Sequence, residues 1–274
     1  MRKLHLAALI VIVLVFIASV ASIVAFNSQL SPKSNSPILY TYHVVKTYPH
    51  DTRAFTEGLV FNGDVLYEST GGYGAIIGSS ISDISSLRRV DLESGNVTKE
   101  ILLTENYFGE GLTVVNDSLI QLTWQNGIGF IYKKESFALE GNFSYNTEGW
   151  GLTYNGKNLI MSDGTSNLYF LDPVTFQKTG QVSVHDGNSS VININELEYI
   201  NGDVYANIWL TQKIAIIHPQ TGTVKGWIDL TGLYQPNDEN SVLNGIAYDS
   251  QTNKLFVTGK NWPNLYQITI TPKT

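Results

Sequence analysis

The sequence has no cysteine, and this absence removes several classes of chemistry at once. Without thiols the chain has no disulfide, no thiolate metal site and no cysteine nucleophile. Basic residues are also few, since 17 Lys and Arg stand against 24 Asp and Glu, a formal net charge of −7. Nucleic-acid binding needs clustered Lys and Arg, so a nucleic-acid partner is excluded. The histidines show no metal-ligand spacing, and no metal or cofactor is predicted.

Amphipathic helical periodicity is missing as well, because no such pattern occurs after residue 40. What the sequence does contain is apolar and aromatic residues, at 43% and 11% of the 274 positions. That length is enough for one large domain or two small ones, and the composition suffices for a sizeable core. The fold class predicted from these two observations is all-β.

The longest apolar run lies at the N-terminus, where residues 4–26 follow two basic residues. A run of 23 residues can cross a bilayer as a helix, and the basic start should stay in the cytoplasm. Segment 1–26 is therefore predicted to be a hydrophobic helix that anchors the chain in a membrane, with the rest outside the cytoplasm. The alternative is a signal peptide removed near residues 19–21, which would give a secreted protein. Residues 27–38 are predicted to be a flexible tether.

Residues 39–274 carry one pattern five times over. The copies are TEGLVFNGDVLYEST, GEGLTVVNDSLIQLTW, EGWGLTYNGKNLIMSDG, INELEYINGDVYANIW and LNGIAYDSQTNKLFVTGK. Aligned on Gly58, Gly111, Gly151, Glu196 and Gly245, they are spaced by 53, 40, 45 and 49 residues. The mean spacing of about 47 is typical of four-stranded propeller blades.

Each copy consists of two short apolar strands joined by a turn, such as Asn155-Gly156 or Asn201-Gly202, a strong hairpin signal. A third strand follows each copy, and a fourth follows most of them. The last copy ends after its third strand, and a strand from Tyr40 to Tyr48 is left over at the front. We therefore predict a five-bladed β-propeller closed by this N-terminal strand; a β-sandwich or two packed sheets are the alternatives.

In a propeller the first strand of each blade lines the central channel, so the residues just before the aligned positions should share one ring. These residues are Glu57, Glu110, Trp150, Asn195 and Asn244. The second strands should end on the same face, at Thr70, Trp124, Gly164, Trp209 and Lys260. With Phe55 and Phe108 as apolar wall, this predicts a concave ligand site with aromatic sides and a few polar groups.

Each of these residues also has an ordinary structural interpretation. Glu110 could be a solvated loop charge, the tryptophans could be core, and Asn195 and Asn244 could form turns. Lys260 could be a surface lysine whose stem covers an apolar neighbour. Their shared register argues for a site, because independent core or turn roles would not favour the same two positions of every copy.

The longer motifs resemble those of a known family. They are AFTEGL at 54–59, YESTGGYG at 67–74, YFGEGLT at 107–113, GWGL at 149–152, SDGTS at 162–166, NELEYINGDVYANIW at 195–209, LNGIAY at 243–248 and VTGKNWP at 257–263. Over residues 42–270 the chain resembles the glutaminyl-peptide cyclotransferases of the plant and bacterial type, which are five-bladed propellers. The resemblance implies an acyltransferase that acts on peptides or proteins with N-terminal glutamine.

The resemblance also implies roles for individual residues. Glu110 would be the catalytic acid/base, and Trp124, Trp150 and Trp209 would form the substrate cage. The polar site residues would be Asn195 and Lys260, and the lining residues Phe55 and Phe108. Glu57 departs from the pattern, since family members often carry Gln at this position. A second carboxylate near Glu110 should raise one of the two pKa values.

The chemistry of cyclisation suits these residue types. The α-amine of an N-terminal glutamine must lose a proton and attack the side-chain amide carbon, while the leaving ammonia must gain one, so a single carboxylate can carry the proton. Lys260, Asn195 and an indole N–H are candidate donors to the oxyanion. A calcium-dependent propeller hydrolase such as a lactonase, with Glu57, Glu110, Asn195 and Asn244 as ligands, is one alternative. A non-catalytic binding propeller is the other. We expect a monomer.

Overall fold

This computed structural model describes residues 36–73, 84–236 and 238–273, and residues 37–274 form a compact unit. The regular elements in the described ranges are all β-strands, so the predicted all-β class is confirmed. Over these same ranges, no helix has the length and apolar character needed to cross a membrane. The segment 1–26, predicted as anchor or signal helix, and most of the tether at 27–38 lie outside the described residues.

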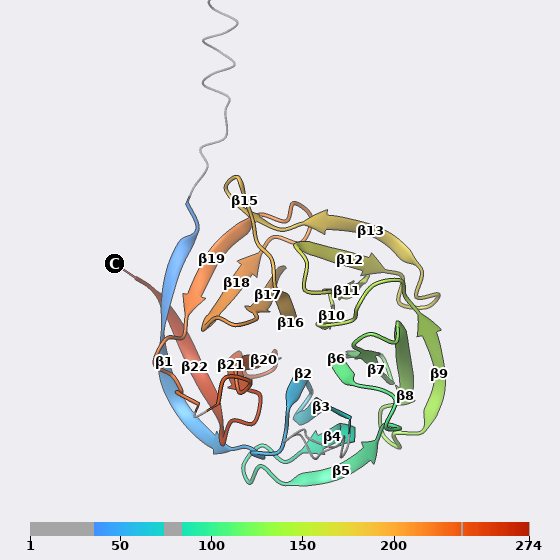
Figure 1. Ribbon diagram of the computed structural model, residues 1–274. Coiled ribbons are helices and arrows are strands. Elements are labelled where there is room, and N and C mark those ends of the chain that lie inside the picture. Colours follow the sequence, from blue (N-terminus) through green and yellow to red (C-terminus); the bar gives the residue numbers. More distant parts are fainter. Residues whose placement is uncertain (1–35, 74–83, 237, 274) are drawn as a thin grey trace, which may run out of the picture. The chain divides into compact units, whose positions relative to one another are not determined.

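The strands follow one another in antiparallel groups of four (Figure 1). The first group is β2 (Thr56–Asn62), β3 (Val65–Tyr73), β4 (Ile84–Val90) and β5 (Val97–Leu102). The second is β6 (Gly109–Val115), β7 (Ser118–Thr123), β8 (Ile128–Lys133) and β9 (Leu139–Ser144). The third is β10 (Leu152–Tyr154), β11 (Leu159–Met161), β12 (Asn167–Leu171) and β13 (Lys178–Ser183). A small hairpin, β14 (His185–Asp186) and β15 (Ser189–Ser190), follows it.

The remaining strands form one eight-stranded sheet that joins the two ends of the domain. The fourth group is β16 (Ile194–Ile200), β17 (Asp203–Ile208), β18 (Lys213–Ile217) and β19 (Val224–Asp229). The fifth is β20 (Leu243–Asp249), β21 (Lys254–Gly259), β22 (Asn264–Pro272) and β1 (Ile38–Pro49). The strand predicted at Tyr40–Tyr48 is β1, which pairs antiparallel with β22 and, through its first residues, parallel with β19. The last group is thus completed by the first strand of the chain.

The apolar core lies between successive groups. Val60 and Leu87 of the first group pack with Leu112 and Leu119 of the second, and similar clusters join the second to the third, the third to the fourth and the fourth to the fifth. A further cluster containing Leu59 and Phe256 joins the fifth group back to the first. The groups therefore follow one another around a common centre, with β5, β9 and β13 on the outside (Figure 1).

Glycine at the aligned positions allows the innermost strands to approach one another closely. A Cβ atom on Gly58 would lie 2.5 Å from the backbone nitrogen of Leu112, and one on Gly111 would lie 2.5 Å from that of Leu152. Real Cβ atoms do not come so near to backbone atoms. In the fourth group the aligned residue is Glu196 instead, and its carboxylate accepts hydrogen bonds from the backbone of the first and fifth groups, at Leu59 and Ile246.

Irregularities in the first strands fall at the predicted ring of polar residues. The register with the second strand shifts between Thr56 and Gly58, between Gly109 and Leu112, between Ile194 and Leu197, and between Leu243 and Ile246. Such bulges redirect a side chain and are common beside active sites.

A buried polar network fixes the segment that leads from β1 into the first group. His50 contacts the backbone oxygen of Trp262 at 2.7 Å and the carboxylate of Glu68 at 2.9 Å. Arg88 lies 3.2 Å from Asp51 and 4.0 Å from Glu68. His50 is thus a structural residue, because it links the fifth group to the first.

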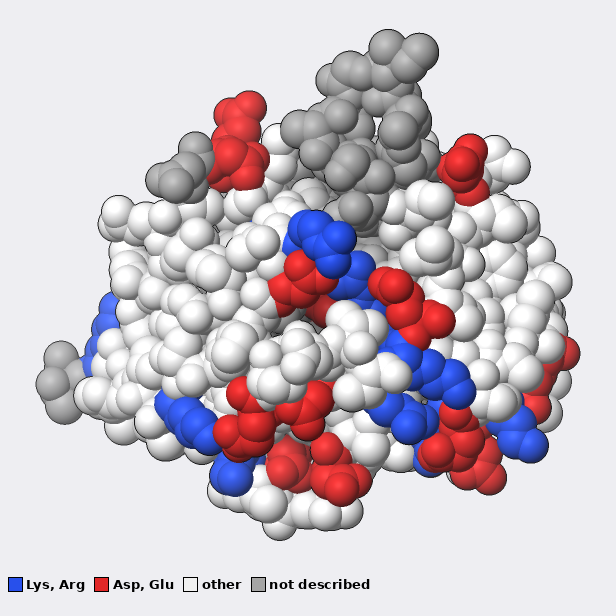
Figure 2. Space-filling view, turned by 90° about the horizontal axis from the view of Figure 1, so that it is seen from below, with Lys and Arg blue, Asp and Glu red and all other residues white. Residues whose placement is uncertain are grey.

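The outer surface carries charges of both signs. Figure 2, which views the domain from below the orientation of Figure 1, shows basic and acidic side chains interspersed on this face. Examples among the described residues are Lys46 with Glu93 at 2.7 Å and Arg89 with Glu135 at 3.3 Å. Exposed pairs of this kind contribute little to stability.

Candidate active site

A cavity of about 340 Å³ opens where the first strands begin and the second strands end. Its lining residues are Phe55, Glu57, Phe108, Glu110, Trp124, Trp150, Asn195, Trp209, Leu210, Glu239, Asn240 and Lys260. The structure thus brings together nine of the twelve residues that the sequence placed around the site. The other three, Thr70, Gly164 and Asn244, do not line the cavity, and Asn244 is fully buried behind Glu57.

Glu110 occupies the inner end of the cavity. It lies in β6, where the backbone on both sides is fixed by hydrogen bonds from Gly109 to Ser85 Oγ and from Gly111 to the backbone oxygen of Trp150. Its side chain is 5% exposed, and its Oε2 atom has no hydrogen-bond partner among the described residues. Burial raises the pKa of Glu110 well above its ordinary value, and the neighbouring Glu57 carboxylate raises it further. A raised pKa suits a carboxyl group that must both give and take a proton during a reaction.

Glu57 differs from Glu110 because it has partners for both oxygens. Lys260 Nζ lies 2.6 Å from Glu57 Oε1, and Asn244 Nδ2 donates to Glu57 Oε2 at 3.0 Å. Burial raises the pKa of Glu57, and the Lys260 ammonium opposes that rise. Since Glu57 has the cation and the amide donor while Glu110 has neither, Glu57 ionises more readily, and Glu110 is the member of the pair that takes up a proton more readily.

The sequence suggested Lys260 as a donor to the oxyanion, but in the structure its ammonium group has another partner. Its ammonium group is paired with Glu57 and lies 4.5 Å from the ring centroid of Phe55, a cation–π contact. Lys260 is buried by these contacts, at 6% exposure. Lys260 still lines the cavity, but its charge is largely neutralised by Glu57.

Three tryptophans form the walls, and a residue outside the predicted set orients two of them. The indole nitrogens of Trp124 and Trp150 both donate to Glu148 Oε2, at 2.8 and 2.9 Å. These two indoles are therefore unavailable as oxyanion donors. Trp150 packs edge-to-face against Trp209, with ring centroids 5.6 Å apart. The indole nitrogen of Trp209 has no hydrogen-bond partner in the described part of the chain, so it is the remaining indole candidate.

Asn195 contributes a second buried acceptor. Its Oδ1 atom, like Glu110 Oε2, has no partner among the described residues, and the residue is 3% exposed. Its backbone oxygen accepts a hydrogen bond from Ser162 Oγ at 2.7 Å, which fixes the strand at this point. Buried polar atoms are almost always hydrogen-bonded. Because Glu110 and Asn195 both line the cavity, their unpaired oxygens mark where a ligand with N–H donors fits, whereas the unpaired oxygens of Gln121 and Asn244 belong to residues outside the lining.

The mouth of the cavity was not predicted. Leu210, Glu239 and Asn240 are its exposed lining residues. Leu210 directly follows the predicted Trp209, whereas Glu239 and Asn240 lie in the connection between the fourth and fifth groups. The repeat gives no register for such a connection, so Glu239 and Asn240 could not be predicted from it. Leu210 could have been predicted, because it is the next residue after Trp209.

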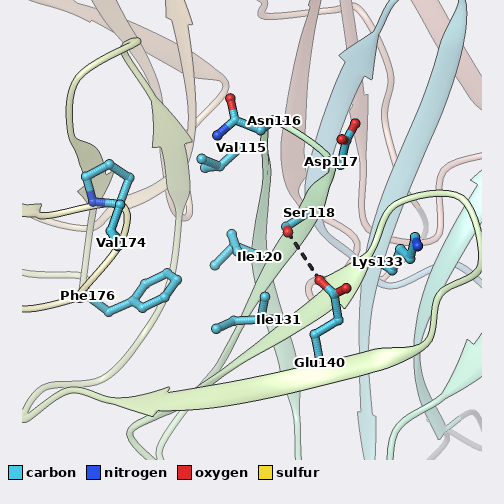
Figure 3. Close-up of a pocket in the computed structure, with 11 residues that line it drawn as sticks. Val115, Asn116, Asp117, Ser118, Ile120, Ile131, Lys133, Glu140, Val174 and Phe176 are labelled. Atoms are coloured by element: carbon cyan, nitrogen blue, oxygen red, sulfur yellow. Dashed lines mark hydrogen bonds between the residues drawn. The ribbon is translucent and has the colours of Figure 1, made fainter.

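A second cavity of about 530 Å³ lies between the second and third groups, beside the turns that follow β6 and β12 (Figure 3). Val115, Ile120, Ile131 and Phe176 form its apolar side, and Ser118 donates to Glu140 at 3.4 Å at its rim. None of the predicted site residues lies in it. The smaller cavity is the candidate active site, because it contains the unpaired acceptors and the carboxyl group with a raised pKa.

Comparison with known proteins gives one consistent result. The sequence profile of a family described as glutamine cyclotransferase matches residues 14–270. A glutaminyl-peptide cyclotransferase of Arabidopsis thaliana is 44% identical over 232 residues, which is 82% of this chain and 70% of the relative. The crystal structure of Myxococcus xanthus glutaminyl cyclase superposes with a TM-score of 0.79 at 37% identity, covering 87% of this chain and 100% of that one.

Proposed function

Since the chain belongs to the glutamine cyclotransferase family and is a glutaminyl-peptide cyclotransferase, an acyltransferase, we propose how its cavity carries out the reaction. The N-terminal glutamine of a peptide or protein enters the cavity and leaves as pyroglutamate, with release of ammonia. Glu110 is the acid/base, and the reaction needs no metal. Phe55, Phe108 and the three tryptophans hold the substrate.

The observation that carries this proposal is the pair of unpaired acceptors at the inner end of the cavity. Glu110 Oε2 and Asn195 Oδ1 are buried oxygens without partners among the described residues. An N-terminal glutamine presents N–H donors at two places, its α-amine and its side-chain amide. It therefore offers the groups that these oxygens lack, and its apolar stem matches the aromatic walls.

The proton balance of the reaction needs one carrier. The neutral α-amine attacks the side-chain amide carbon, a C–N bond forms, and the attacking nitrogen releases a proton to Glu110. Glu110 returns the proton to the departing amide nitrogen as the old C–N bond breaks, so that ammonia leaves. The raised pKa of Glu110 lies closer to the α-amine's ordinary pKa of about 7.7–8.0, which favours transfer in both directions.

The protein's second task is to hold one side-chain conformation of the substrate. Nucleophile and electrophile belong to the same residue, so the rate depends on how often the chain folds back on itself. Trp150 and Trp209, at 89° to each other, provide two faces of a corner that restricts this freedom. Their faces also attract a cationic amine.

Replacing Glu110 by Gln tests the proposal. The variant keeps the shape but cannot carry a proton, and we expect ammonia release from a Gln-initiated dipeptide to fall by about 10²–10⁴-fold. Glu140→Gln, at the rim of the second cavity, is the matched control and should retain the rate. Full activity of Glu110→Gln would refute the acid/base assignment, and a pure binding protein would show no ammonia release at all.

A calcium-dependent reaction is the competing mechanism, and one contact argues against it. The two carboxylate oxygens of Glu57 are occupied by Lys260 and Asn244, and an ammonium group beside a divalent cation would be repelled. Activity that EDTA removes and Ca²⁺ restores would overturn the metal-free mechanism.

We propose further that the five strand groups are the blades of a five-bladed β-propeller closed by β1. The period of about 47 residues and the apolar clusters between successive groups support this architecture. We also propose that segment 1–26 anchors the enzyme in a membrane, or directs its secretion if cleaved, with the catalytic domain outside the cytoplasm as a monomer. N-terminal sequencing of the protein from membrane and soluble fractions separates the anchor from the cleaved signal, and sedimentation measures the oligomeric state.

A further inference from the structure

Leu210 combines two unfavourable properties at the mouth of the active-site cavity. Its side chain is 61% exposed, and its backbone has φ of +63°, in the left-handed region that disfavours residues with a bulky side chain. Holding a non-glycine residue in this region of φ costs conformational free energy. Because the side chain is mostly in solvent, burial in the fold does not compensate for this strain.

The fifth strand group contains the same turn with a residue that suits it. The backbone N–H of Thr211 bonds to the oxygen of Ile208 at 3.0 Å, and that of Trp262 bonds to the oxygen of Gly259 at 3.1 Å. The left-handed position of the second turn is Asn261, with φ of +59°. Asparagine tolerates this conformation well, and its side chain donates to the backbone of Thr52 at 3.1 Å.

The position of Leu210 along the cavity indicates what its side chain contacts. Glu110 is 5% exposed at the inner end, whereas Leu210 lies at the open end. In the proposed reaction the glutamine at the N-terminus of the substrate reacts at Glu110, so the next residue of the peptide must lie at the mouth. This step rests on the proposed function.

The remaining residues at the mouth limit the charge that this second residue can carry. Glu239 and Asn240 are the other exposed lining residues, and Glu239 is the carboxylate among them. Among the described residues of the lining, Lys260 is the one basic residue, and it is paired with Glu57. A negative mouth disfavours an acidic side chain.

We propose that Leu210 and Glu239 form a subsite for the side chain of the second substrate residue. This subsite selects apolar side chains over glycine and over acidic ones. Leu210 supplies the apolar contact, and Glu239 supplies the discrimination against a carboxylate. The strained backbone is retained because only a large apolar residue at this position completes the contact with the peptide.

The test measures kcat/KM of the full chain for the dipeptides Gln-Leu, Gln-Gly and Gln-Glu, by ammonia release. We expect Gln-Leu to exceed Gln-Gly by about tenfold, as for a pocket that recognises a small apolar group, and Gln-Glu to be the poorest. Leu210→Gly and Leu210→Asn should lose most of the preference for Gln-Leu. Glu239→Gln should reduce the discrimination against Gln-Glu.

Stability and specificity are separated by the same variants. Glycine and asparagine both suit a left-handed backbone, so both Leu210 variants should be at least as stable to urea as the wild type. Asn261→Gly, in the matched turn outside the cavity, should keep the wild-type ratio of Gln-Leu to Gln-Gly. Equal kcat/KM for Gln-Leu and Gln-Gly, or an unchanged ratio in Leu210→Gly, would overturn the subsite. Absence of ammonia from all three dipeptides would instead overturn the activity on which it rests.

Discussion

Two carboxyl groups share the inner end of the cavity, and their different partners give them different tasks. Glu57 has Lys260 and Asn244 as donors, whereas one oxygen of Glu110 has no partner among the described residues. The charge held on Glu57 is one reason why the pKa of Glu110 is raised. Glu110 is thus the residue suited to carry the proton, because Glu57 already binds Lys260 and Asn244.

Replacing Glu57 by Gln should shift the pH dependence of the reaction. The variant removes a negative charge beside Glu110 and frees the Lys260 ammonium, and both changes lower the pKa of Glu110. We expect the acidic limb of the kcat/KM profile to move down by about 1–2 pH units. Glu140→Gln serves as the control with an unshifted profile. An acidic limb at the wild-type position in Glu57→Gln would show that Glu57 does not act on Glu110.

Glu148 is the residue that positions the indole walls. It accepts from Trp124 and Trp150 through one oxygen and from Gln125 through the other, at 3.2 Å. Glu148→Ala should lower kcat by about 10–100-fold, because small displacements of positioning groups are costly. Glu148→Gln keeps a carbonyl acceptor and should recover most of the rate. Near-ultraviolet circular dichroism of the tryptophans should change in the Ala variant; an unchanged spectrum with lowered kcat would contradict a positioning role.

The residues of the site were predictable where the repeat supplied their register. Glu110, Trp150 and Asn195 precede the aligned positions, so the ring could be written down from spacing alone. Glu148 was missed because its role depends on which way two indole rings turn, and nothing in the spacing of residues sets that direction. Asn244 has the right register, but a bulge at the start of β20 directs its amide toward Glu57.

At the level of strands, the close approach of the inner strands sets a strict limit on side-chain size. A Cβ atom at Gly111 would lie 2.5 Å from the Leu152 nitrogen and 2.6 Å from the Trp150 oxygen. These are backbone atoms of the next group, which cannot rotate away. The alignment on glycine that revealed the repeat therefore reflects packing at the centre of the domain.

Gly111→Ala should lower the free energy of unfolding by about 1–3 kcal/mol or more, as overpacking does elsewhere. Gly156→Ala is a suitable comparison, since φ is +85° there but no atom lies within 4 Å of the added Cβ. That variant has only the backbone strain, of about 1 kcal/mol. Urea unfolding of both variants measures the difference. Equal losses would mean that the crowding between β6 and the third group is relieved by movement of the strands.

Most strands could be predicted because turns and apolar runs specify them locally. The runs beginning at Ile128 and Asn167 start β8 and β12, and Asn201 and Gly202 both take the positive φ that their turn requires. The bulges and the hairpin of β14 and β15 were not predicted. A bulge is decided by how neighbouring sheets crowd the inner strand, and that crowding is a property of the assembled groups.

For the domain as a whole, two buried acids on one inner strand make stability depend on pH. Glu196 and Glu198 are both buried in β16 and accept backbone hydrogen bonds from the neighbouring group, at Ile246 and Tyr248. Burial raises the pKa of Glu196 well above its ordinary value and that of Glu198 to about 8. For His50, burial opposes protonation, but the Glu68 carboxylate prevails and raises the pKa of the imidazole.

All three groups have a higher pKa in the folded chain than in the unfolded chain, so between about pH 5 and 8 the folded state binds more protons than the unfolded state. The free energy of unfolding must then fall over this interval, by up to about 1.4 kcal/mol per pH unit for each fully linked proton. We expect the urea midpoint to be highest near pH 5–6 and clearly lower at pH 8.5. Burial raises the pKa values of Asp51 and Glu68, but their basic partners outweigh it and lower both values overall. Below the optimum pH, protonation of these two carboxylates therefore reduces stability.

Glu198→Gln isolates one contribution to this pH dependence. The amide keeps an oxygen that can accept from the Tyr248 backbone, at 3.0 Å in the wild type, but it does not titrate. The variant should therefore lose less stability than the wild type between pH 5.5 and 8.5, while Glu140→Gln, at the rim of the second cavity, should follow the wild-type curve. Two results would contradict this account: a wild-type urea midpoint that rises toward pH 8.5, or a Glu198→Gln curve parallel to that of the wild type. Either result would show that the protons on the buried acids of β16 do not stabilise the folded domain.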